Sequence, residues 1–140
     1  MTVVRRGFPT LMTLLVCGTL SCGHTDATAA APGSTWSSDD AVLSVTETGA
    51  ELRLLASGGC VGSYVSVTGP FLGLSINRTG TFTQLIGAYP GRVTYAAQVS
   101  GSFRDTVMRL TVTVPELARV IGPLDLVRGV RHDWPTCAYP

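Results

Sequence analysis

The chain has 140 residues, enough for one domain, and its formal net charge at neutral pH is +1. A balance this close to neutral, with the Arg residues scattered along the chain, excludes the basic surface that a nucleic-acid partner needs. The 16 glycines and the many β-branched residues favour short strands joined by tight turns.

The first stretch, residues 1–21, has the parts of an export signal. Arg5 and Arg6 provide a positive start, and an apolar run follows over residues 11–20. Because a helix needs roughly 20 apolar residues to cross a bilayer, this run is too short for a membrane span. We therefore predict that residues 1–21 are a signal peptide and that the protein is exported.

Residues 19–22 read Thr-Leu-Ser-Cys and resemble the lipobox of bacterial lipoproteins, in which the Cys is lipidated. The match predicts that Cys22 carries acyl chains, palmitate included, and anchors the protein to a membrane of the cell envelope. The alternative is a secreted or periplasmic soluble protein, cleaved near residues 29–31. Residues 22–38, rich in small and polar residues, are then a flexible tether, and residues 39–140 form the domain.

The domain shows runs of alternating apolar and polar residues, which indicate half-buried strands. The clearest runs lie in residues 92–114, where the polar break at Arg104 and Asp105 predicts a hairpin. Asn77 and Gly80 are interpreted as a turn, and Pro123 places the last strand at an edge or a bulge. The expected strands cover residues 41–47, 51–57, 60–68, 71–77 and 81–88, two within 92–114, and 120–128.

Eight short antiparallel strands with almost no helix predict an all-β fold, an up-and-down small barrel, with a β-sandwich as the alternative. Hairpin-length links favour the barrel, since closing the sheet removes its edges. A barrel of this size has an interior that side chains fill or that holds one small ligand. We expect it to be filled by Leu43, Leu52, Leu54, Leu72, Leu74, Ile76, Phe82, Val93, Tyr95, Val99, Met108, Leu110 and Val112.

Two cysteines belong to the domain, because Cys17 leaves with the signal and Cys22 is the lipid site. They are Cys60 and Cys137, and export places them in an oxidising compartment. We predict that they form a disulfide. Two distant Cys without a nearby His pair do not match the spacing of a zinc site, so no metal is expected.

The segment 100–112, Ser-Gly-Ser-Phe-Arg-Asp-Thr-Val-Met-Arg-Leu-Thr-Val, resembles a pattern in small bacterial exported lipoproteins of uncharacterised function. Asp105 stands where that group would have Gly, so the turn geometry differs. The resemblance covers residues 36–137 and implies a compact all-β domain and no activity. Other similar features are Trp36 at the domain start, Cys60 after a Gly pair with Cys137 near the end, and Gly80-Thr81-Phe82 at a strand start.

Groups suited to catalysis are few in the sequence. His132 and Asp133 are neighbours, but a catalytic triad depends on convergence in space, and a surface turn is the simpler interpretation. The chain has no Gly-x-Ser-x-Gly elbow, and no two carboxylates stand on the expected inward faces. Gln84 is the best candidate for a polar group in a pocket. We therefore predict no catalytic residue and no cofactor.

Three classes of function compete. The favoured one is a non-enzymatic envelope lipoprotein, a tethered binding or structural module with an unknown protein or envelope partner. The alternative is a lipocalin-like carrier of a small apolar ligand. The third, an enzyme, lacks converging titratable groups. A filled interior favours the first class, and an open apolar cavity favours the second.

Overall fold

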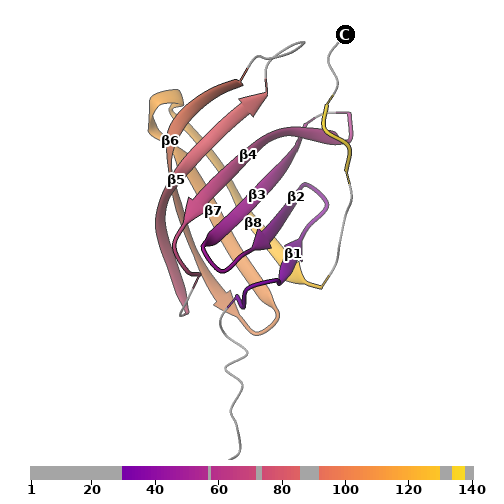
Figure 1. The fold of residues 1–140 in the computed structure, drawn as a ribbon, viewed down its shortest axis with the longest axis vertical. Helices are drawn as coiled ribbons and strands as arrows, with labels where there is room; N and C mark the ends of the chain where they lie inside the picture. The colour runs from indigo at the N-terminus through magenta and orange to yellow at the C-terminus, as the bar shows by residue number, and fades with distance from the viewer. Residues whose placement is uncertain (1–29, 57, 72–73, 86–91, 130–133, 138–140) are drawn as a thin grey trace, which may run out of the picture.

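The computed structural model describes residues 30–56, 58–71, 74–85, 92–129 and 134–137. Within these ranges, strands follow one another in an antiparallel meander, and the last strand pairs with the first to close a barrel (Figure 1). The predicted all-β up-and-down barrel is thus confirmed over the sandwich. The strands are β1 (Thr35–Ser37), β2 (Ala41–Val45), β3 (Gly49–Ala56), β4 (Cys60–Thr68), β5 (Ser75–Leu85), β6 (Arg92–Arg104), β7 (Val107–Val114) and β8 (Arg119–Arg128).

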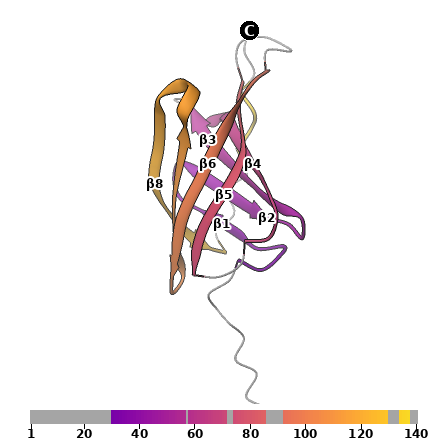
Figure 2. The ribbon, with the colours of Figure 1, turned by 90° about the vertical axis from the view of Figure 1, so that its left-hand side faces the viewer.

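Helical structure in the described ranges is a single 3-10 turn, η1 (Pro115–Leu117), between β7 and β8. None of the described helical residues forms a segment long and apolar enough to cross a membrane. We call the end of the barrel with the β3–β4 turn the upper end, and the end with the β6–β7 turn the lower end (Figure 1). β5 and β6 are the long pair, side by side along the barrel (Figure 2).

The first strand lies inside the stretch expected to be a tether. β1 pairs with β2 and β8, and its Trp36 is buried, opposite Leu43 and Arg128 in register. Ala30 is buried as well. The expected boundary at residue 39 therefore falls after the first strand rather than before it. Three residues are too few to show alternation, so barrel closure, not a local pattern, defines this strand.

The turn expected at Asn77 and Gly80 is wrong, because β5 runs through both residues without a break. Asn77 pairs with Ser100 and Gly80 pairs with Ala97. A Cβ atom at Gly80 would lie 2.5 Å from the backbone oxygen of Ser66. The glycine thus permits a close approach of β4 to β5 inside a strand, which is the other common role of glycine there. Two expected strands become one, and with β1 the number remains eight.

The predicted hairpin and the predicted bulge are both present. Arg104 pairs with Val107 across a two-residue turn, where Asp105 has φ +54°, a region that Asp tolerates better than most residues. The register of the β7–β8 pair shifts between Leu110 and Val112 of β7. Pro123 lies in this irregular part of β8, where its missing N–H removes no regular ladder bond.

The barrel interior contains one apolar cluster. Nine of the side chains expected to point inward are 6% exposed or less. Trp36 adds to them and meets Phe103 edge to face, with ring centroids 5.7 Å apart. These buried side chains lie between the strands inside the barrel. The nine are Leu43, Leu52, Leu54, Ile76, Phe82, Val99, Met108, Leu110 and Val112.

Two of the expected core residues are exposed instead. Leu74 is 62% exposed because it precedes the first residue of β5 and lies in the lower connection, not on a strand. Val93 is 38% exposed because β6 extends past the end of β7, whose pairing with β6 begins only at Gln98. Tyr95, on the same extension, is partly buried against the core. Leu72 lies outside the described residues.

Candidate functional site

The seam between β4 and β5 is staggered. The two strands pair only between Ser63–Gln84 and Val67–Gly80, whereas β5 pairs with β6 along its whole length. Two parts of the seam are therefore without a strand partner on this side among the described residues. One is the upper start of β4 at residues 60–62, and the other is the lower start of β5 at residues 75–79.

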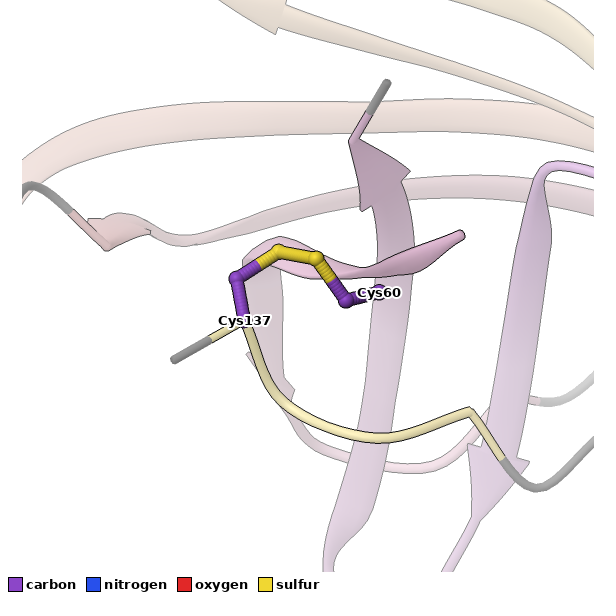
Figure 3. Close-up of a disulfide and its surroundings, with 2 residues drawn as sticks. All are labelled: Cys60 and Cys137. Carbon is purple, nitrogen blue, oxygen red and sulfur yellow. A yellow bond between two sulfur atoms is a disulfide. The ribbon is translucent and has the colours of Figure 1, made fainter. Parts of the chain in front are cut away.

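The upper start of β4 is covered by the C-terminal segment 134–137, which we call the tail. The N–H of Val61 donates to the oxygen of Pro135 at 2.9 Å, and the N–H of Cys137 donates to the oxygen of Val61 at 3.2 Å. Val61 and Thr136 form a parallel bridge. The disulfide predicted between Cys60 and Cys137 is present, with Cα atoms 4.9 Å apart (Figure 3).

The tail and the outer face of the sheet enclose a hollow of about 320 Å³, which we call the tail groove. Its volume lies at the lower end of the range for small-molecule sites. Side chains from β3, β4, β5 and β6 form its floor, and the tail forms one wall. The lining residues are Glu51, Arg53, Val61, Tyr64, Leu85, Arg92, Trp134 and Thr136.

Charge in the tail groove is unevenly paired. The Nε of Arg53 donates to Oε1 of Glu51 at 2.8 Å, within one strand. Their side chains are 56% and 41% exposed, so solvent screens the pair and its main effect is to orient the guanidinium. Arg92 is exposed at the start of β6, and the described residues give it no ion-pair partner. The described residues that line the groove thus carry one positive charge in excess.

A second hollow, of about 450 Å³, lies on the outer face of β6, β7 and β8 at the lower end. Here Arg109 donates from Nε and Nη2 to the two carboxylate oxygens of Asp125, at 2.7 and 2.8 Å. These hydrogen bonds hold the pKa of the Asp125 carboxyl below its ordinary value. Arg104 and Asp105 complete the charges that line the hollow. This hollow is therefore electrically balanced, unlike the tail groove.

Aromatic and polar groups also meet on the inward side at the upper end of the barrel. The guanidinium of Arg119 lies 5.7 Å from the ring centroid of Phe82, and the Phe82 and Tyr95 rings are 6.5 Å apart. Gln84, the expected pocket residue, is half-buried between Ser63 and Val93 in register. The structure does not bring Gln84 into the tail groove.

Three other residues singled out from the sequence lie in ranges that the structure does not describe. Cys22, His132 and Asp133 lie outside the described residues, so lipidation remains a prediction. The described side chains include no cluster of three potential metal ligands. Patterns in the sequence do not identify the residues of the tail groove, because these residues come from five separate segments of the chain. The one signal that could have found them is the disulfide, which places residues near 137 beside residue 60.

Comparison of the chain with protein-family models, with curated proteins and with solved structures gives no match. The compact β-domain implied by the resemblance to exported lipoproteins is present as an eight-stranded barrel.

Proposed function

We propose that this protein is a non-enzymatic, exported envelope lipoprotein. Its barrel is a binding module that is held at a membrane by the lipidated Cys22 and that contacts an envelope component through the tail groove. The observation that carries the proposal is the burial of the apolar side chains inside the barrel. Leu43, Leu52 and Leu110 are each 1% exposed or less, so the functional groups that remain available gather on the outside.

The direction of the chain supports this arrangement. Residue 33 donates its N–H to the oxygen of Val45, which places the start of the described chain at the lower end. The eight residues from Cys22 to Ala30 reach at most about 29 Å, at roughly 3.6 Å per residue. An anchor on Cys22 would hold the lower end towards the membrane. The tail groove, at the upper end, would then face away from it.

The anchor is tested by metabolic labelling with a fatty-acid analogue in a host that exports the protein. We expect the label on the wild-type protein and its loss in Cys22→Ala, together with release of that variant from the membrane fraction. Cys17→Ala is the matched control and should keep both the label and the membrane location. A Cys22→Ala variant that stays with the membrane would contradict the proposal.

The carrier of a small apolar ligand is the second candidate, and one observation favours it. Tyr95 and Val93 stand on the inward side of β6 near the upper end and are only partly covered by the described residues. A fluorescent fatty acid discriminates the two functions. We expect no saturable binding of the fatty acid to the wild type. A small apolar probe such as benzene should bind only after Leu110→Ala opens a cavity. Saturable uptake by the wild type would replace the module with the carrier.

A further inference from the structure

The geometry points to a carboxylate-bearing saccharide as the ligand of the tail groove. This inference deepens the proposed function and rests on it, since it assigns a ligand class to the same surface. The groove combines two aromatic side chains, Tyr64 and Trp134, with two guanidinium groups and one carboxylate. Aromatic side chains offer flat apolar faces, and a few placed polar groups around them set orientation.

The polar groups of the groove include both donors and an acceptor. Arg53 uses Nε on Glu51, which leaves the Nη edge of its guanidinium as donors. Glu51 is an acceptor, and its carboxylate oxygens have more lone pairs than the single bond to Arg53 uses. A sugar ring carries hydroxyl groups that both donate and accept, so a mixed set of this kind matches it.

The excess charge selects among saccharides. Arg92 stands at the groove without an ion-pair partner among the described residues, and Arg53 is already oriented by Glu51. A guanidinium binds a carboxylate through two parallel hydrogen bonds, and such charge-assisted bonds are stronger than neutral ones. An acidic sugar would bring the missing negative charge to Arg92, and a neutral sugar of the same shape would not.

Backbone pairing disfavours an extended peptide at this place. A peptide that binds by strand addition needs free N–H and C=O groups on a sheet edge. At the upper start of β4 the tail already uses both groups of Val61. This pairing favours a ligand that side chains recognise, such as a saccharide, and the disulfide maintains the wall from which Trp134 reaches the groove.

The test is a titration of the full mature protein, isotope-labelled and held in detergent micelles, with a trimer of galacturonic acid. The neutral galactose trimer and a tri-glutamate peptide are the comparison ligands. The indole N–H signal of Trp134 reports on the groove, and that of the buried Trp36 serves as an internal reference. We expect the acidic trimer to shift the Trp134 signal saturably, and the neutral trimer to bind at least tenfold more weakly.

Two variants of one strand distinguish binding in the tail groove from a general effect of the protein's net charge. Arg92→Gln and Arg104→Gln each remove one positive charge from an exposed end of β6, but Arg104 lines the lower hollow. We expect Arg92→Gln to weaken binding of the acidic trimer at least tenfold and Arg104→Gln to change it less than twofold. Equal losses in both variants, equal binding of the neutral trimer, or tighter binding of the peptide would overturn the inference.

Failure of the ligand class is distinguishable from failure of the proposed function. If the acidic trimer does not bind while the wild type is lipidated and excludes the fluorescent fatty acid, the saccharide is wrong and the tethered module stands. If the wild type takes up the fatty acid, the proposed function fails whatever the trimer does.

Discussion

The two ends of the staggered β4–β5 seam are closed by different means. At the lower end, residues 69–71 cover the start of β5. Gly69 donates its N–H to Thr48, the oxygen of Pro70 accepts from Arg78, and Phe71 is buried at 2% exposure. At the upper end, the tail covers the start of β4 with two backbone hydrogen bonds and a disulfide.

This difference shows how a groove can persist beside a small core. Each of the tail's four described residues is exposed or half-buried, so the tail buries less of its own apolar surface than Phe71 does at the lower end. The covalent bond between Cys60 and Cys137 replaces that burial. At the lower end Phe71 is buried in the core cluster, whereas at the upper end the tail covers the start of β4 and leaves a hollow of about 320 Å³ beneath it.

The largest effect is expected at the lower closure. Phe71→Ala removes a buried aromatic side chain from the core cluster and should lower the free energy of unfolding by about 3–5 kcal/mol. Urea unfolding followed by tryptophan fluorescence measures it. Leu74→Ala, in the same connection but 62% exposed, is the control and should change stability by less than about 0.5 kcal/mol. Equal effects would mean that burial of Phe71 does not close the seam.

The upper closure should respond to loss of the disulfide. The bond spans 77 residues, for which the chain-entropy account gives roughly 4–5 kcal/mol, and measured losses often fall below that value. We expect the double variant Cys60→Ser with Cys137→Ser to lose about 2–4 kcal/mol in urea unfolding. Addition of a reductant should lower the stability of the wild type and leave that of the double variant unchanged. A reductant effect on the double variant would contradict this interpretation.

Removing the side chain of Trp134 from the wall of the groove should lower the free energy of unfolding much less than removing the disulfide. Trp134 is half-buried in the tail, so Trp134→Ala should lower the free energy of unfolding by about 1 kcal/mol or less. Thermal unfolding compared with the double Ser variant measures the contrast. A loss as large as that of the double variant would show that Trp134, and not the disulfide, holds the tail against β4.

The smallest effect is expected at the exposed Arg109–Asp125 pair of the lower hollow. Because the hydrogen bonds from Arg109 lower the pKa of Asp125 in the folded protein, the pair stabilises the fold above the ordinary Asp pKa. This contribution is lost as the pH falls through the lowered pKa. Asp125→Asn should therefore flatten the acid side of the stability profile slightly. A variant with the same acid dependence as the wild type would rule out this contribution.

Local patterns in the sequence determined much of the fold. Alternation with period 2 located most of the strands, the polar break at Arg104 and Asp105 located the hairpin, and Pro123 marked the bulge. These signals are local, since each depends on residues that are neighbours along the chain. The cysteine pair was also predictable, because the expected export and the expected lipidation of Cys22 left Cys60 and Cys137 as the domain's pair.

Tertiary structure alone decided the remaining features. β1 is a strand because closure of the barrel pairs Trp36 with Leu43 and Arg128, and three residues show no period of their own. Gly80 continues a strand instead of turning it because β4 passes close to its Cα. In the tail groove, Glu51, Arg53 and Arg92 lie beneath the tail. The first two belong to β3 and the third to β6, and the register of those strands is set by the closed barrel. A local pattern carries no information about such distant neighbours, which are placed by register and by the disulfide.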